Sequence, residues 1–131
     1  MIERHFGESA PLSLGVEEEV MILDAETLEP AAAVDVLVRG AESLDLPGSL
    51  KTELHSHVVE LTTGICKSVD EAIEALHVLR AAADRIARDN GLVIAAAGGH
   101  PTAALSSSPP PIRCTGSAAT ARCCAGPPHP E

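Results

Sequence analysis

The segment Ser68–Gly91 constrains the fold of this chain most, because it carries helix signals at both ends. Ser68 followed by Glu71 is a capping box, in which two side chains satisfy free backbone amides at a helix start. Asn90 before Gly91 is typical of a helix that ends through a left-handed residue. The apolar positions between these ends recur with helical spacing and predict one buried face, made of Val69, Ala72, Ile73, Leu76, Leu79, Ala83 and Ile86.

A strand pattern precedes this helix in the sequence. Alternation along Leu12–Leu23 predicts one apolar face, formed by Leu14, Val16, Val20 and Ile22. The opposite face of this strand would carry Glu17, Glu19, Met21 and Leu23. Glu18 interrupts the apolar face, and the local pattern gives no reason for a carboxylate there.

Three further segments complete the expected order of elements. Ala32–Leu44 has helical spacing, Val58–Thr63 has strand-like composition, and Leu92–Ala97 resembles a buried strand. The order strand, helix, strand, helix, strand predicts an α+β fold with helices on one face of a sheet, and leaves an α/β arrangement open.

Four glutamates lie in or beside these strand-like segments: Glu17, Glu19, Glu53 and Glu60. Burying an unpaired charge is costly, so carboxylates in apolar segments need a partner. Mg²⁺ prefers hard oxygen ligands and usually binds together with substrate phosphates. The pattern therefore suggests a metal and nucleotide site, although spacing alone favours a solvated strand face for Glu17 and Glu19.

The spacing of Glu53 and Glu60 poses a geometric problem. The two residues are an odd number of positions apart, so one regular strand would place them on opposite faces. A short helical or bulged piece around Glu53, followed by a strand, would bring both to one side. We expect one of these two arrangements.

Histidines and a cysteine near these acids receive simpler explanations. His55 and His57 form a His-x-His pair of a kind that can bind a transition metal, but we expect exposed polar side chains instead. Cys66 has no base beside it in the sequence, so we expect a small buried apolar side chain.

Taken in order, these motifs resemble the type 2 glutamate–cysteine ligases, also called carboxylate-amine ligases. Gly15–Asp24 is similar to their opening strand, with its Gly-x-Glu-x-Glu acids. Glu53–Cys66 is similar to their second motif, an acidic residue followed after six others by Glu-x-x-Thr-Gly. Gly98–Pro101 is similar to the Gly-(Thr/Ser)-His-Pro segment that closes the next strand.

The resemblance implies a partial glutamine-synthetase-like antiparallel sheet and ATP-dependent amide-bond formation. In such enzymes the γ-carboxylate of glutamate is phosphorylated by ATP, and an amine such as that of cysteine attacks the acyl phosphate. The resemblance assigns Glu17, Glu19, Glu53 and Glu60 to binding of Mg²⁺ or Mn²⁺, and assigns catalytic roles to Glu60 and His100. It identifies no nucleotide-contacting residue.

Charge and hydropathy exclude other classes of function. The net charge of −10 argues against a nucleic-acid partner, because a phosphate-binding surface needs a Lys/Arg patch. No apolar run has the ~18 residues of a membrane span and no signal peptide is visible, so we expect a cytoplasmic protein without membrane contact. The resemblance covers roughly residues 10–101. The arginines of this region are expected to lie on helices, away from the acids: Arg39, Arg80, Arg85 and Arg88.

Composition divides the chain at about residue 101. Residues 1–101 are expected to form the opening part of a ligase catalytic domain, and residues 102–131 a Pro/Ser/Ala-rich tail. The tail is interpreted either as a disordered extension or as the product of a frameshift or truncation. Its cysteines fit neither a zinc pattern nor a disulfide framework: Cys114, Cys123 and Cys124.

Two alternatives to a ligase remain open. One is a non-catalytic acidic fragment or metal-binding module, in which an unpaired sheet edge favours self-association into a homo-oligomer. The other is a hydrolase that uses the same carboxylates with a metal. In the ligase interpretation, the isolated 131-residue chain is expected to be inactive.

Overall fold

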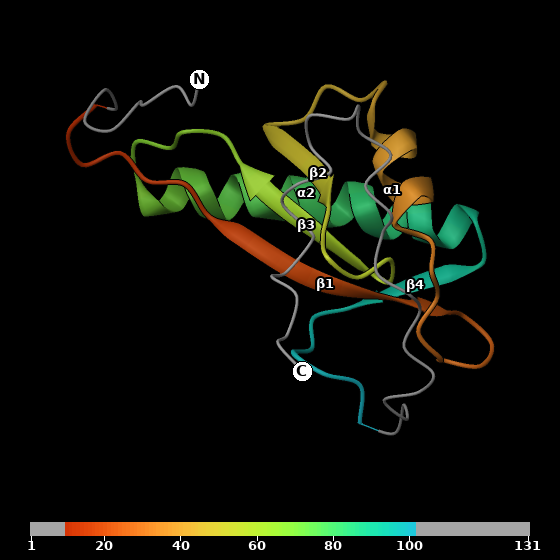
Figure 1. The fold of residues 1–131 in the computed structure, drawn as a ribbon. Coiled ribbons are helices and arrows are strands. Elements are labelled where there is room, and N and C mark those ends of the chain that lie inside the picture. The colour runs from red at the N-terminus through yellow and green to blue at the C-terminus, as the bar shows by residue number, and fades with distance from the viewer. Residues whose placement is uncertain (1–9, 102–131) are drawn as a thin grey trace, which may run out of the picture.

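A four-stranded antiparallel sheet forms one layer of the protein (Figure 1). The computed structural model describes residues 10–101. The strands are β1 (Glu17–Asp24), β2 (Gly48–Thr52), β3 (Val58–Thr63) and β4 (Leu92–Ala95), and they lie in the order β2-β3-β1-β4. Every neighbouring pair is antiparallel, as expected from the resemblance.

Two helices cover one face of this sheet, which confirms the predicted α+β fold (Figure 1). They are α1 (Val34–Ala41) and α2 (Val69–Asp89). The core lies between helices and sheet and is aliphatic, with its largest fully buried side chains being Ile22, Leu37, Val59, Leu61 and Leu79. The other face of the sheet has no helix packed on it within the described residues, which leaves that face for a site.

The helix α2 forms as its end signals predict. The hydroxyl of Ser68 accepts a hydrogen bond from the Glu71 amide at 3.2 Å, and Gly91 ends the helix with a φ of 70°. The buried face differs from the prediction in one respect, because Val69 and Ile73 are 63% and 47% exposed. Alanines take their place, and the helix packs closely on the sheet through Ala72, Ala75, Ala82, Ala83 and Ala87.

The strand β1 begins later than its alternation predicts. Leu12 has a φ of 63°, which is not a strand conformation, and Leu14 forms only an isolated bridge with Cys66. Cys66 is buried, as expected. From Glu17 onwards, β1 alternates as predicted, and it pairs with β3 on one side and with β4 on the other.

The region between α1 and α2 differs most from the sequence prediction. No helical or bulged piece surrounds Glu53; the chain forms the strand β2, turns over residues 53–57 and returns as β3. The backbone of Gly48 lies so close to β3 that a Cβ there would collide with the carbonyl oxygen of Thr62 and lie 2.9 Å from the Thr63 Cα. Glycine is therefore required where β2 begins.

The remaining elements are shorter than predicted. The helix α1 covers Val34–Ala41 rather than Ala32–Leu44, and β4 ends at Ala95. β4 is an edge strand and is only partly buried beyond Leu92. Over residues 10–101 no helix has the length and apolarity needed to cross a membrane. The predicted tail and the cysteines Cys114, Cys123 and Cys124 lie outside the described residues.

Candidate functional site

The hairpin of β2 and β3 places polar residues on the helix-free face of the sheet. Lys51 pairs with Glu60, and Glu60 pairs on its other side with Glu19 of β1. Residues that pair directly across antiparallel strands project from the same face. Lys51, Glu60 and Glu19 therefore form one row across three strands, called here the acid row.

The acid row places two carboxylates side by side on neighbouring strands, and the pairing of the strands does not itself require acidic residues there. Glu19 and Glu60 are directly opposite each other, and like charges in such positions destabilise a sheet. Glu17 lies two residues along β1 on the same face and pairs with Thr62. The structure thus brings Glu19 and Glu60 together, with Glu17 at the next position of β1 on the same face.

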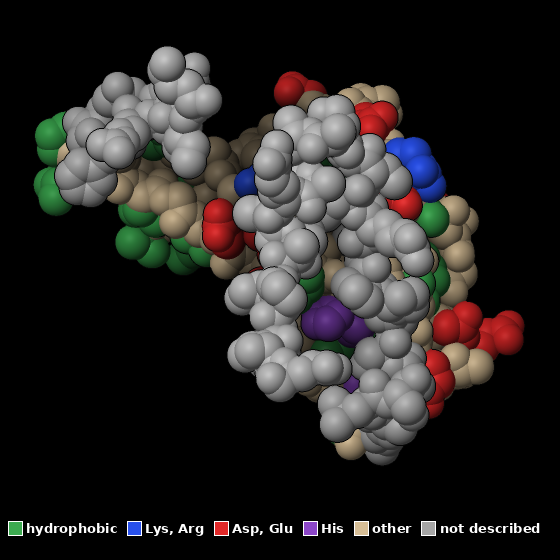
Figure 2. Space-filling view, in the orientation of Figure 1, with side chains coloured by type: hydrophobic (Ala, Val, Ile, Leu, Met, Phe, Trp, Pro, Cys, Tyr) green, Lys and Arg blue, Asp and Glu red, His purple; other side chains and the backbone are tan. Residues whose placement is uncertain are grey.

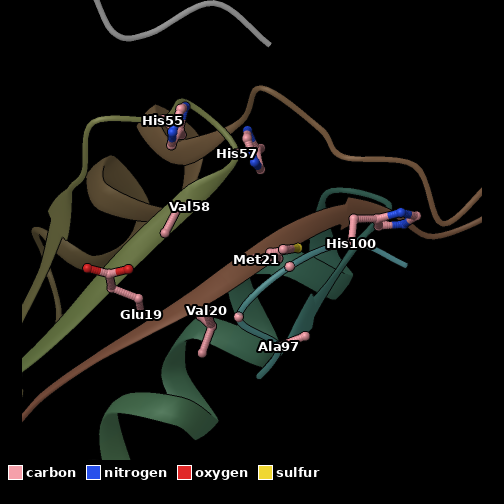
Figure 3. A pocket seen from close by; sticks show the side chains of 10 residues that line it. Glu19, Val20, Met21, His55, His57, Val58, Ala97 and His100 are labelled. Carbon is pink, nitrogen blue, oxygen red and sulfur yellow. The ribbon is translucent and has the colours of Figure 1, made fainter. Parts of the chain in front are cut away.

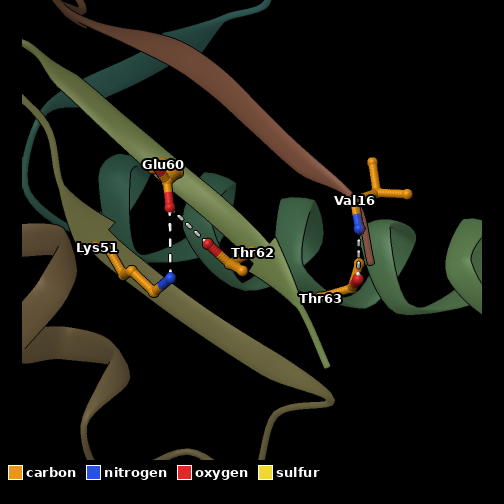
Figure 4. Close-up of polar contacts among 5 residues, drawn as sticks. All are labelled: Val16, Lys51, Glu60, Thr62 and Thr63. Carbon is orange, nitrogen blue, oxygen red and sulfur yellow. Dashed lines mark hydrogen bonds and ion pairs between the residues drawn. The ribbon is translucent and has the colours of Figure 1, made fainter. Parts of the chain in front are cut away.

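Contacts on β2 and β3 hold the carboxylate of Glu60 (Figure 4). The hydroxyl of Thr62 donates a hydrogen bond of 2.7 Å to the Oε1 of Glu60. The ammonium of Lys51 lies 3.4 Å from the same oxygen. The Glu60 side chain is 15% exposed, whereas that of Lys51 is 49% exposed. Glu60 is thus the most enclosed carboxylate of the row.

Glu53 and His100 lie apart from this pair of carboxylates. Glu53 follows the last residue of β2, and its carboxylate accepts a hydrogen bond from the neighbouring amide of Leu54 at 2.5 Å. The Nε2 of His100 donates to the carbonyl oxygen of Leu28 at 2.8 Å. His100 is therefore anchored to the turn that follows β1.

A cavity of about 410 Å³ lies beside the acid row on the helix-free face (Figure 3). Glu19 lines it at one end and His100 at another, with Met21 between them. His55 and His57 lie along its rim, where their rings are 5.3 Å apart between centroids. Figure 2 shows histidine side chains on this face, with acidic side chains to either side.

The structure buries His57, contrary to the expectation that both histidines of the pair are exposed. Only 8% of His57 is accessible, and its Nδ1 has no hydrogen-bond partner within the described residues. The His57 carbonyl accepts from the Ile22 amide at 2.7 Å, which holds this turn against β1. Burial, with a smaller contribution from the charge of His55, lowers the pKa of His57.

The unexplained carboxylate of Glu18 faces the helices. The guanidinium of Arg80 on α2 donates to Glu18 twice, from Nε to Oε2 and from Nη2 to Oε1, both at 2.6 Å. These hydrogen bonds raise the pKa of Arg80. Glu18 is therefore a structural residue of the helix-packed face and does not belong to the acid row.

The acid row fits Mg²⁺ or Mn²⁺ in the type and number of its donors. Within residues 10–101, no three or more His, Cys, Asp or Glu side chains are grouped closely enough to enclose a metal ion. Mg²⁺, however, commonly uses one or two carboxylates and takes its other ligands from waters and phosphates. Glu19 and Glu60 supply two such carboxylates, so a joint site of all four predicted glutamates is not needed.

Sequence reasoning missed Lys51. The face that carries the acids was expected to lack basic groups, because the arginines were predicted to lie on helices. Arg80 does lie on a helix, but Lys51 occupies the acid row. The signal that could have found it is the hairpin, since the chain reversal between Lys51 and Glu60 makes them partners.

Comparisons with known proteins agree with the family resemblance of the sequence motifs. The family model of glutamate–cysteine ligase family 2 matches residues 13–117. A protein of Sorangium cellulosum, provisionally named glutamate–cysteine ligase 2, is 41% identical over 90 residues, which is 68% of this chain and 24% of that protein. A protein of Herpetosiphon aurantiacus with the same provisional name is 38% identical over 91 residues, 70% of this chain and 23% of that protein. The chain spans about a quarter of the length of the curated relatives it matches, and it belongs to glutamate–cysteine ligase family 2.

Proposed function

We propose that this chain provides the acid-bearing part of an ATP-dependent carboxylate–amine ligase site. In this reaction the γ-carboxylate of glutamate attacks the terminal phosphorus of ATP and releases ADP. The amine of cysteine then displaces phosphate from the acyl phosphate, giving γ-glutamylcysteine and a proton. The observation that carries the proposal is the direct pairing of Glu19 with Glu60 on the helix-free face, in a member of this family.

The proposed roles of the residues follow from their positions. Glu19 and Glu60 would hold the divalent cation, with Glu17 within reach of the same face. When bound, the cation supplies neutralisation of charge on the transferred phosphoryl group, which is the main requirement of phosphoryl transfer. Glu53 and His100 have hydrogen bonds to the Leu54 amide and to the Leu28 carbonyl oxygen, and neither is needed to hold the cation in this arrangement.

The cavity supports a small-molecule site next to these acids. It lies between Glu19 and His100 and includes the buried ring of His57. Its volume is within the range of common small-ligand pockets. We propose that glutamate or the amine substrate occupies this cavity, with the reacting carboxylate toward the acid row.

A metal titration of the 131-residue chain tests the proposal. Free Mn²⁺ is followed by electron paramagnetic resonance in the parent protein and in the Glu19→Gln, Glu60→Gln and double variants. The double variant is expected to bind Mn²⁺ at least tenfold more weakly, which corresponds to about 1.4 kcal/mol. Glu42→Gln is the matched control, because Glu42 is an exposed glutamate that follows α1, away from the acid row.

The titration has outcomes that contradict the proposal. Mn²⁺ affinity that is equal in the parent and in the double variant would remove the acid row as a metal site. An equal loss of Mn²⁺ affinity in Glu42→Gln would show that the effect comes from the change in net charge alone. If the acid row binds Mn²⁺ but ATP has no affinity for the Mn²⁺-loaded chain, the metal-binding module without ligase function becomes the better description.

A further inference from the structure

Lys51 is the only cationic side chain on the strands of the described sheet. The other Lys and Arg residues in that part of the chain lie on the helices or just before one: Arg39, Lys67, Arg80, Arg85 and Arg88. In the acid row, Lys51 stands next to Glu60, and Glu19 lies beyond Glu60. A positive charge therefore adjoins the carboxylates to which the proposed function assigns the metal.

The contact between Lys51 and Glu60 is easily exchanged. Its length of 3.4 Å is beyond the usual range of a charge-assisted hydrogen bond, and half of the Lys51 side chain is exposed. Exposed ion pairs of this kind contribute little to stability. The 2.7 Å hydrogen bond from Thr62 is much shorter and ends on the same oxygen. Glu60 thus keeps its orientation when Lys51 moves away.

A divalent cation at Glu60 would make the present position of the Lys51 ammonium unfavourable. The ammonium then faces a like charge at short range, and repulsion favours its displacement toward solvent. Its flexible four-carbon stem lets it reach a nearby anion, and Lys is a common phosphate ligand. The anions that accompany a ligase cation are the phosphates of the nucleotide.

We propose that Lys51 is a phosphate-contacting residue of the site, which leaves Glu60 when the cation binds and pairs with a nucleotide phosphate oxygen. This inference rests on the proposed function. It gives Lys51 two opposite roles, as a competitor of the bare cation at Glu60 and as a ligand of the nucleotide that arrives with the cation. A residue that only stabilises the hairpin would affect both ligands in the same direction.

Binding measurements on the full 131-residue chain separate these possibilities. Mn²⁺ alone is titrated by electron paramagnetic resonance, and ATP is titrated at saturating Mn²⁺ by calorimetry. Lys51→Gln is expected to bind Mn²⁺ alone two- to threefold more tightly, and to bind ATP at least threefold more weakly. Lys51→Arg, which keeps the charge, is expected to remain within twofold of the parent for ATP.

Lys67→Gln is the matched control, since it removes the same charge outside the sheet. It should leave the Mn²⁺ affinity and the ATP affinity unchanged within twofold. Lys67→Gln effects equal to those of Lys51→Gln would show a general charge effect and overturn the inference. Circular dichroism of each variant checks that the fold is retained.

The outcomes also distinguish this inference from the proposed function. If Glu19→Gln and Glu60→Gln do not alter Mn²⁺ affinity, the proposed function fails, and the role of Lys51 fails with it. If those variants weaken Mn²⁺ binding while Lys51→Gln moves both affinities in one direction, or neither, only the Lys51 inference is overturned. If the Mn²⁺-loaded parent chain has no measurable ATP affinity, both the ligase function and the Lys51 inference are overturned, while the metal site remains.

Discussion

Arg80 on α2 and Glu18 on β1 form a two-pronged ion pair on the face of the sheet opposite to the acid row. Glu18 lies between Glu17 and Glu19 in the sequence. Its ion pair with Arg80 therefore fixes β1 at the point where Glu17 and Glu19 project from the other face. The carboxylate that interrupts the apolar face thus attaches β1 to the long helix.

Removal of this ion pair is expected to destabilise the protein modestly. Because the Arg80 side chain is 48% exposed, Arg80→Gln should lower the free energy of unfolding by about 1 kcal/mol or less. Chemical denaturation of Glu18→Gln, Arg80→Gln and the double variant would measure the coupling between them. Arg88→Gln is the control, because its ion pair with Asp84 lies within one helix. No coupling between Glu18 and Arg80 would contradict a structural role for Glu18.

His57 is expected to make stability depend on pH. Because its pKa is lowered in the folded state, the unfolded chain binds the proton more readily. Stability should therefore rise with pH between the lowered pKa of His57 and its ordinary value of 6.5, and should level off above that value. Melting temperatures from pH 5 to pH 8 should show this slope in the parent.

The His57→Gln variant should show a smaller slope over the same pH range. His77→Gln, which replaces an exposed histidine on α2, is the control and should keep the parental slope. Equal slopes in all three proteins would mean that His57 is not buried in solution.

Gly48 should not tolerate a side chain. A Cβ there meets backbone of β3, which cannot move without breaking the hairpin. Gly48→Ala is expected to cost roughly 1–3 kcal/mol of unfolding free energy. Gly98→Ala is the control, since nothing lies within 4 Å of a Cβ at that position. A melting temperature of Gly48→Ala equal to that of Gly98→Ala would contradict the close approach of β2 to β3.

Turnover by the 131-residue chain alone is expected to be undetectable. Phosphoryl transfer depends on several groups that position the phosphates and neutralise their charge. Lys51 is the only cation on the described strands, and the described lining of the cavity contains no Lys or Arg. Release of ADP that depends on glutamate and cysteine is the measurement. Robust release that Glu60→Gln abolishes would contradict this prediction and support the ligase assignment.

Local signals in the sequence predicted some elements well. The capping residues Ser68 and Glu71 and the terminal Gly91 act within a few residues of themselves, so the bounds of α2 were predictable. The alternation of β1 likewise placed Glu17 and Glu19 on one face.

Features that depend on distant contacts were not predictable in this way. The partner of Glu18 is 62 residues away, and no local pattern indicates Arg80. Glu60 faces Glu19 only because β3 pairs with β1, and Lys51 joins them only because the chain reverses at residues 53–57. The burial of His57 depends on the same turn, which packs against β1.

The chain reverses at residues 53–57, and the number of residues in this turn matters to the site as much as any side chain. Loss or gain of one residue there would move β2 or β3 by one position, and such a shift turns every side chain of a strand to the other face. Lys51 or Glu60 would then point into the aliphatic core. The number of residues in this turn therefore fixes the register that keeps Lys51 and Glu60 on the helix-free face.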